Sequence, residues 1–468
     1  MSLSYLILII RLVLALSVFL VAFPAQALTL TEAIRLARQS DPVLLGAEAN
    51  LAASQERTVQ ASANLLPQVS VTANTMANHR DYEIINTLSP IAKDQYNSNS
   101  AQLSVTQPLV RNAYAMASVQ AEAATTQSAY QYKAAEQDML VRLAQAWFDV
   151  MLARDTADFA GAQVDATRLL WEQTRRATEL KIEAGPALEE ARSKYDQAVS
   201  DFASAEIDES IKAATLEQIV GTLKDFAPPS LPGDYAMAES HLGTLEQWLS
   251  HAEAESPAIL AAVYALEAAH DEVKKQRAGH DPTLDIVATY GYNYQAVGTF
   301  PGQSGYDIRQ RAIGLQLNIP LFSGGGQNAK VRESLAMSEK AVQDLEAARR
   351  SVRLTAKQAW FGWQAGNAHQ KAAMQSMRSS LASLASAIDG KSEGIKTELD
   401  ILQARQQLYG ARRDLQKSRY ELITSYLKLK STAGALKDAD LASFDVWFAR
   451  GKNKADWSRL PDGMIGAQ

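Results

Sequence analysis

The sequence TLDIVATYGYNYQA, residues 283–296, alternates apolar and polar side chains over most of its length. A second stretch, QRAIGLQLNIPLF at residues 310–322, places isoleucine and leucine on one side and glutamine and asparagine on the other. This two-residue period predicts two β-strands, each with one polar and one apolar face. Tyrosines 290, 292 and 294 gather towards one end of the first strand, which is typical of outer-membrane strands with an interfacial aromatic girdle. The edge of a soluble sandwich shows the same alternation and is the alternative.

The chain contains one unit twice. Pro42 recurs as Pro257, 215 residues later, and the tetrapeptide Gln-Ala-Trp-Phe of residues 145–148 recurs at 358–361, 213 residues later. Two copies of a unit of about 200 residues are therefore predicted, since a repeat of this length is a duplicated domain rather than a solenoid. The segment Phe-Ala-Pro-Pro-Ser-Leu-Pro-Gly at residues 226–233 is predicted to link them.

Long helices are predicted from the distribution of proline. No proline lies between Leu109 and Gly185, or between Leu321 and Leu460, so two very long helical stretches are permitted. A single helix over residues 327–393 would be roughly 100 Å long. Apolar residues at alternating steps of three and four, interrupted at Ser338 and Arg349, predict a coiled-coil seam at Val331, Leu335, Val342, Leu345, Val352, Ala356, Ala359 and Trp363.

The N-terminus is typical of an export signal. An apolar run at residues 12–23 follows Arg11 and ends at Pro-Ala-Gln-Ala, a signal-peptidase pattern. An uncleaved membrane helix is the alternative, but Arg11 interrupts the apolar stretch. The expected organisation begins with a signal peptide at 1–27 and a first repeat at 28–225, which has strands at about 68–79 and 99–110 and a long helical hairpin at about 111–222. An inter-repeat segment at 226–255 leads to a second repeat at 256–434, which has strands at about 283–296 and 310–322 and a long hairpin at about 327–432. A C-terminal segment follows at 435–468.

Composition excludes several classes of protein. The 468 residues include no cysteine, which rules out disulfides, thiolate metal sites and a lipid anchor on cysteine. The net charge of −6 does not fit a nucleic-acid binder. Gly324-Gly325-Gly326 lacks the Lys-Ser/Thr of a phosphate loop, and His241 and His251 lack zinc-site spacing. No catalytic residue, metal site or cofactor is predicted.

Four strands per chain constrain the assembly. A barrel in lipid must close, because lipid cannot satisfy an open sheet edge, and known barrels of this kind have at least about eight strands. Two copies would supply eight strands and three copies twelve, and this reasoning leaves both possible. A soluble periplasmic coiled-coil scaffold is an alternative that explains the long helices but not the strands.

The order of these elements resembles the TolC family of outer-membrane channel-tunnels. The resemblance rests on Leu65-Leu66-Pro67 before the first strand, residues 320–325 (PLFSGG) after the fourth, and Ala433-Gly434 at the end of the second repeat. It implies a mixed α+β homotrimer in the outer membrane, with a 12-stranded β-barrel continued by a helical tunnel through the periplasm. It also implies an equatorial collar around the tunnel, to which the inter-repeat segment 226–255 and the C-terminal segment 435–468 contribute as equatorial segments.

The function that the resemblance implies is that of a passive exit duct, not an enzyme. Such a duct serves type I secretion or efflux together with a periplasmic adaptor and an inner-membrane transporter, either ABC-type or proton-driven. The absence of a cysteine after the signal favours the secretion branch, with multidrug or small-molecule efflux as the alternative. The cargo and the transporter's energy source stay open.

The segment Gly394-Ile395-Lys396-Thr397-Glu398-Leu399-Asp400 is similar to the family's periplasmic-tip motif. The resemblance implies a turn at the glycine and an aspartate at the pore entrance; the family's second acid is replaced by Gln403. The alternative is that Asp400 is a solvated acid near a helix N-terminus. In the first repeat, Gly185-Pro186 is expected to form the turn. The expected sites are a pore gate of Asp400, Lys396 and Gln403; adaptor docking at Lys181, Gly185, Gly394 and Thr397; and interfacial aromatics Tyr290, Tyr292 and Tyr294.

Overall fold

The computed structural model describes two compact units of the chain. The described residues are 28–82, 92–180, 185–223, 229, 231, 243–298 and 303–450, so the predicted signal peptide and Lys181 lie outside them. Unit 1 comprises the described residues of 1–45, 136–249 and 355–468, and unit 2 those of 46–135 and 250–354. None of the described helices is both long and apolar enough to cross a membrane.

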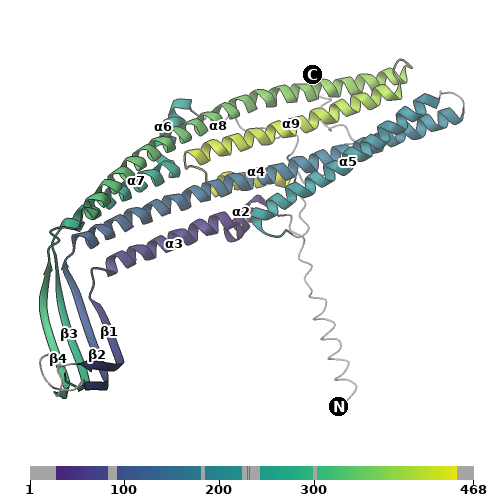
Figure 1. The fold of residues 1–468 in the computed structure, drawn as a ribbon. Coiled ribbons are helices and arrows are strands. Elements are labelled where there is room, and N and C mark those ends of the chain that lie inside the picture. The colour runs from purple at the N-terminus through teal and green to yellow at the C-terminus, as the bar shows by residue number, and fades with distance from the viewer. Residues whose placement is uncertain are drawn as a thin grey trace, which may run out of the picture. The chain divides into compact units, whose positions relative to one another are not determined.

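Unit 2 contains an antiparallel four-stranded sheet (Figure 1). Its strands are β1 (Gln68–Tyr82), β2 (Ala92–Val110), β3 (Thr283–Val297) and β4 (Ser304–Asn318), in the spatial order β1-β2-β3-β4. Because β2 comes from the first repeat and β3 from the second, their pairing joins both repeats in one sheet.

The strand ends differ from those predicted, most clearly in β4. This strand ends at Asn318 rather than 322 and begins at Ser304 rather than 310. Pro320 has no N–H to donate to a ladder, which explains the earlier end. The same property explains the register shift in the β2–β3 pairing between Pro108 and Val110.

The helices of unit 2 continue from the sheet. Helix α4 (Asn112–Glu179) follows β2, α7 (Pro257–Arg277) precedes β3, and α8 (Gly326–Ser392) follows β4; α4 and α8 run on into unit 1. Tyr130 of α4 stacks on Tyr264 of α7 with ring centroids 5.4 Å apart. Helix α3 (Pro42–Ala63) packs on the other side of α4, where the hydroxyls of Thr58 and Thr125 lie 2.8 Å apart.

The predicted seam of α8 is wrong in part. Leu345, Val352 and Ala356 are buried, but Leu335 is 43% exposed and Val342 38%. Ser338, which was expected to interrupt the seam, is buried instead and lies 3.2 Å from Nδ1 of His270 on α7. Its small side chain lets the two helices approach closely, so the buried stripe is displaced from the apolar one.

Unit 1 contains both helical hairpins and the chain's terminal helices. The hairpins pair α4 with α5 (Gly185–Val220), and α8 with α9 (Glu398–Thr432); α2 (Leu30–Ser40), α6 (Leu245–Glu255) and α10 (Asp438–Arg450) are shorter, and α6 lies partly in unit 2. The α8–α9 hairpin has an apolar core formed by Met377, Leu384, Ala387, Ile401, Leu408 and Leu415.

Aromatic packing fixes the middle of unit 1. Trp147 and Phe148 of α4 are fully buried. Phe148 stacks on Tyr420 of α9 at 5.4 Å and meets Phe444 of α10 edge-on at 5.8 Å. The carboxylate of Asp445 on α10 accepts backbone N–H groups of α2 at 2.8 and 2.9 Å, so the C-terminal helix caps the N-terminal one.

Candidate functional site

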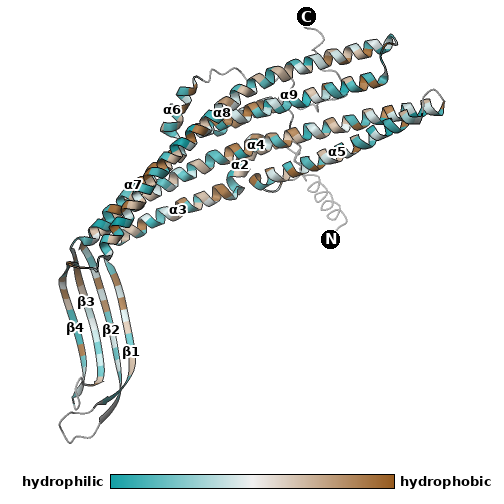
Figure 2. Cartoon of the chain, turned by 45° about the horizontal axis from the view of Figure 1, so that its top comes forward, coloured by the Kyte–Doolittle hydropathy of each residue, from teal (hydrophilic) through white to brown (hydrophobic). Residues whose placement is uncertain are grey.

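One face of the sheet exposes a continuous row of apolar side chains. The register aligns Val69 with Val105, Val105 with Ala288, and Ala288 with Ile313. Apolar positions recur along the strands in Figure 2. Val71 is 71% exposed and Ile313 80%, and a contiguous patch of this kind marks an interaction surface or a lipid contact. The large exposed apolar residues on this face are Val69, Val71, Leu103, Tyr290, Tyr294, Ile313, Leu315 and Leu317.

The opposite face of the sheet is polar. The hydroxyls of Ser70 and Ser104 lie 2.8 Å apart across β1 and β2, and Asn78 donates to Ser98 at 2.9 Å. A sheet with one apolar and one hydrogen-bonded polar face can separate lipid from a water-filled lumen.

The three predicted aromatics lie where the apolar rows of the sheet end. Leu284, Ile286 and Ala288 pair with leucine or isoleucine of β4, whereas Tyr290, Tyr292 and Tyr294 pair with Arg311, Arg309 and Asp307. The Arg311 guanidinium lies 5.3 Å from the centroid of the Tyr290 ring. Amphipathic tyrosine rings beside charged residues are the composition expected at a membrane–water boundary.

The second hairpin turns at Gly394, as the tip motif implied. Gly394 has φ +75°, and its N–H donates to the carbonyl of Lys391 at 3.0 Å. The N–H of Ile395 donates to the carbonyl of Gly390 at 2.9 Å. These two bonds form a Schellman motif, which terminates α8 and needs a residue that tolerates positive φ.

Asp400 lies in the first turn of α9 and caps it. Its Oδ2 accepts the N–H of Thr397 at 2.7 Å and the Thr397 hydroxyl at 2.8 Å, while the Asp400 N–H donates back to that hydroxyl at 3.2 Å. This is a capping box, so Asp400 has a structural use near a helix N-terminus, in line with the alternative interpretation. Both bonds to the carboxylate use Oδ2, so Oδ1 keeps its acceptor capacity.

The surroundings keep Asp400 ionised. Hydrogen bonds from the Thr397 backbone and side chain lower the pKa of Asp400, with a smaller contribution from the charge of Lys396. Lys396 and Gln403 are exposed. Lys391 of α8 and Glu398 of α9 form an ion pair across the turn.

The prediction for the first hairpin turn is wrong. Gly185 and Pro186 are the first two residues of α5, not the turn that follows α4 at Glu179. Proline is compatible with the first helical turn, where its missing N–H would have no helical partner. Gly185, Gly394 and Thr397 are all exposed, and Figure 1 shows the two hairpin ends at the same end of unit 1.

Sequence reasoning missed a buried carboxyl group in unit 1. Asp155 of α4 is 6% exposed and accepts a hydrogen bond from the Tyr420 hydroxyl at 3.1 Å. Burial raises the pKa of Asp155 to about 7, against the lowering effect of this bond. The available signal was its spacing, because Asp155 follows Met151 by four residues and Trp147 by eight on the apolar face of α4.

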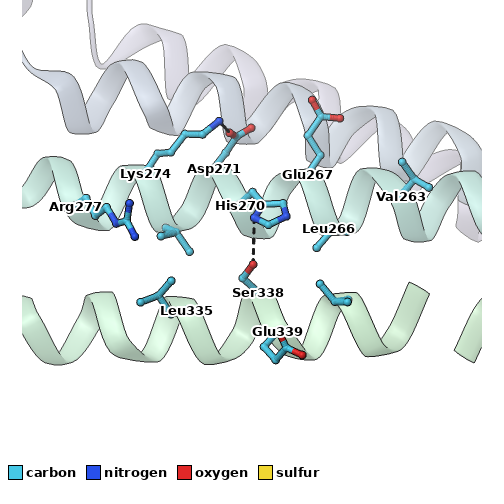
Figure 3. A pocket seen from close by; sticks show the side chains of 12 residues that line it. Val263, Leu266, Glu267, His270, Asp271, Lys274, Arg277, Leu335, Ser338 and Glu339 are labelled. Carbon is cyan, nitrogen blue, oxygen red and sulfur yellow. Dashed lines mark hydrogen bonds and ion pairs between the residues drawn. The ribbon is translucent and has the colours of Figure 1, made fainter. Parts of the chain in front are cut away.

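A groove of about 750 Å³ runs between α7 and α8 in unit 2 (Figure 3). Val263, Leu266 and Leu335 contribute apolar walls, and Lys274 pairs with Asp271 at 2.7 Å on its rim. Among the described residues, no group of histidine and carboxylate side chains could hold a metal ion. The groove also holds the Ser338 hydroxyl 3.2 Å from Nδ1 of His270, but among the residues that the structure describes no carboxylate is hydrogen-bonded to His270 to orient it as a base.

Comparison with known proteins confirms the resemblance to the TolC family. Outer membrane protein TolC of Vibrio cholerae is 27% identical over 413 residues, which cover 88% of this chain and 92% of that protein. The proteases secretion protein PrtF of Dickeya chrysanthemi is 27% identical over 456 residues, which cover 91% and 92%. The crystal structure of the Campylobacter jejuni CmeC outer membrane channel has the same fold, with a TM-score of 0.74 at 15% identity and coverage of 92% of this chain and 90% of that chain. The outer membrane efflux protein model matches residues 33–222 and 248–435, and the chain therefore belongs to this family.

Proposed function

We propose that this chain is the outer-membrane exit duct of a type I secretion or efflux system and that it works as a homotrimer. The observation that carries the proposal is the four-stranded sheet. It has one exposed apolar face, and β1 and β4 are its two edge strands. In lipid, the backbone groups at these edges need partners from further strands.

Further copies of the chain supply those strands. In a closed, symmetric ring, β4 of each copy pairs with β1 of the next. Two copies would give eight strands, and the resemblance to the TolC family supports three, which give twelve. The apolar face then contacts lipid, and the polar face with Ser70 and Ser104 lines the lumen.

The duct itself is passive, and its partners provide energy and cargo. The names of the relatives support both secretion and efflux, since they include a proteases secretion protein and the outer membrane efflux protein BepC of Brucella suis. We place a periplasmic adaptor at the hairpin ends, at Lys181, Gly185, Gly394 and Thr397. We assign the equatorial segments of this assembly to residues 226–255 and 435–468, of which the structure describes 229, 231, 243–255 and 435–450.

The periplasmic gate is formed by Asp400, Lys396 and Gln403 at the tips of the second hairpins. Three-fold symmetry turns one carboxylate per chain into a ring. Two such charges at ~6 Å repel by about 0.7 kcal/mol in bulk water and by about 3 kcal/mol at an effective dielectric of 20. Lys396, whose charge lowers the pKa of Asp400, offsets part of this repulsion in the closed state.

The experiment that tests this function combines deletion of the gene with reconstitution of the purified protein. Deletion is expected to abolish release of one or more secreted proteins, and the purified protein is expected to form discrete ion-conducting channels in planar bilayers. Raised drug susceptibility with unchanged secretion would establish the efflux alternative. Absence of channels in bilayers, together with a deletion strain unchanged in both respects, would refute the proposal.

A further inference from the structure

A buried polar contact joins the two hairpins of unit 1. Asp155 belongs to α4 in the first hairpin and Tyr420 to α9 in the second, and both side chains are buried. Their hydrogen bond of 3.1 Å lies beside the stacked rings of Phe148 and Tyr420. Any separation of α4 from α9 at this level must break this bond and bring water to the Asp155 carboxyl group.

The charged groups nearest Asp155 act on its pKa in opposite directions, since the charge of Asp158 raises it and that of Arg154 lowers it. On α4, Arg154 pairs with Glu209 of α5 at 2.9 Å and lies 3.7 Å from Asp158. Arg419 of α9 is buried next to Tyr420 in sequence, and its charge acts on the Tyr420 hydroxyl. Helix α10 contributes the apolar rings of Phe444 and Phe448, which contact Phe148.

Asp155 takes part in no ion pair among the residues that the structure describes. Its hydrogen-bond donor is the neutral hydroxyl of Tyr420. These surroundings favour the protonated form of the carboxyl group over the ionised form, because an ionised carboxylate loses its hydration on burial.

We infer that Asp155 and Tyr420 form a proton-operated latch between α4 and α9, which holds the hairpins together while Asp155 is neutral and weakens when the carboxylate forms. The inference rests on the proposed channel function for its effect on conduction, because the two hairpins are the segments that would separate in an open tip. The latch itself is a property of unit 1 and can be measured without conduction.

The strength of the latch follows from linkage. The pKa of Asp155 is about 7 in the packed arrangement, and the ordinary value of 3.8 applies once water reaches the carboxyl group. Ionisation therefore favours the loosened arrangement as the pH rises. Between pH 6 and pH 8 the ratio of loosened to packed hairpins is expected to rise about tenfold, and to change little above pH 8.

Hydrogen exchange tests the latch directly. Amide protection in α9 around Tyr420, corrected for intrinsic exchange, is measured at pH 6 and pH 8 in the assembled protein in detergent. Wild type should lose about tenfold protection at pH 8, whereas Asp155→Asn, which keeps an acceptor but cannot ionise, should retain it. Asp165→Asn on the same helix is the matched control, because the Asp165 side chain is 72% exposed, and it should behave as wild type.

Channel recordings provide the second measurement. The open probability of wild type should rise with a midpoint near pH 7, and Asp155→Asn should stay at the acid level throughout. Tyr420→Phe removes the donor that favours the carboxylate, so its midpoint should move to higher pH, which a purely structural role would not produce. Asp149→Asn controls for a second acid of α4 whose pKa is raised by burial near Lys212 and Lys428.

The outcomes separate this inference from the proposed function. A pH step in protection that persists in Asp155→Asn would overturn the latch, even in a protein that conducts normally. A protein that never conducts contradicts the channel proposal, but a tenfold loss of protection that Asp155→Asn abolishes would still support the latch. If Asp155→Asn does not fold, an unchanged midpoint of exchange in Tyr420→Phe would overturn the latch.

Discussion

Substitutions at the α8–α9 turn can separate the charge of Asp400 from its role as a helix cap. Asp400→Ala removes both, Asp400→Asn removes the charge and keeps an acceptor for Thr397, and Thr397→Ala removes the cap and keeps the charge. Loss of a cap costs about 1 kcal/mol of helix stability. A trivalent cation ~6 Å from one carboxylate gains about 2 kcal/mol in bulk water, so each lost charge should weaken its binding at least tenfold.

Block of the channel by a trivalent cation, added from the periplasmic side in planar bilayers, is the assay. Asp400→Asn and Asp400→Ala should both weaken block at least tenfold, and Thr397→Ala should leave it near the wild-type value. Lys396→Ala should strengthen block, because it removes an opposing positive charge. Unchanged block in Asp400→Asn would refute the carboxylate ring, and equal loss in Thr397→Ala would show that the cap, not the charge, is responsible.

Three further predictions concern stability in detergent. Gly394→Ala, at φ +75°, should lower the free energy of unfolding by about 1 kcal/mol. Gly410→Ala lies inside α9, where the added Cβ would meet no atom within 4 Å apart from its chain neighbours and its own helix backbone, and it should raise the free energy of unfolding by up to about 1 kcal/mol. Urea denaturation followed by circular dichroism compares the two variants, and shifts of the same sign would contradict the turn geometry. Trp147→Ala should cost about 3–5 kcal/mol in the same assay, because the side chain is fully buried, and a loss below 1 kcal/mol would contradict the packing. The folded state raises the pKa of Asp155 from 3.8 to about 7, so the free energy of unfolding should fall as the pH rises from about 4 to 7. The free energy of unfolding of Asp155→Asn should therefore exceed that of wild type by up to about 4 kcal/mol at pH 8 and should equal it below pH 4. An equal difference at both pH values would contradict this assignment.

The sequence was most informative where one local pattern determines the structure. Alternation around Tyr290 predicted β3, because the two faces of a strand meet different solvents. The long stretches without proline predicted helices α4 and α8, and Gly394 predicted the turn of the second hairpin because few other residues adopt positive φ.

Other features depended on neighbours that a local pattern does not show. The buried stripe of α8 includes Ser338 and leaves Leu335 at its edge, because the approach of α7 decides which side is covered. Helix α5 begins at Gly185 because the first turn of a helix tolerates proline, whereas the Gly185-Pro186 pair read by itself predicts a turn. The burial of Asp155 depends on α9, more than 200 residues away in the sequence.

In the candidate gate, one feature follows from the local sequence pattern and another depends on neighbouring groups. The motif placed Asp400 correctly next to the turn, but its hydrogen bonds to Thr397 follow from cap geometry that was treated only as an alternative. The capping box uses Oδ2, so both interpretations can hold for one carboxylate. The ring itself requires further copies of the chain.

The number of chains per particle tests the central claim most directly. Native mass spectrometry of the protein extracted from outer membranes should show three identical chains in one detergent-bound particle. The chain has no cysteine, so a variant with one cysteine introduced on β1 and one on β4 contains no other thiol. These two cysteines should form disulfides only between different copies, because β1 and β4 lie at opposite edges of the sheet within one chain. A monodisperse monomer that stays in solution without detergent, with no disulfide between β1 and β4 of different copies, would contradict the account.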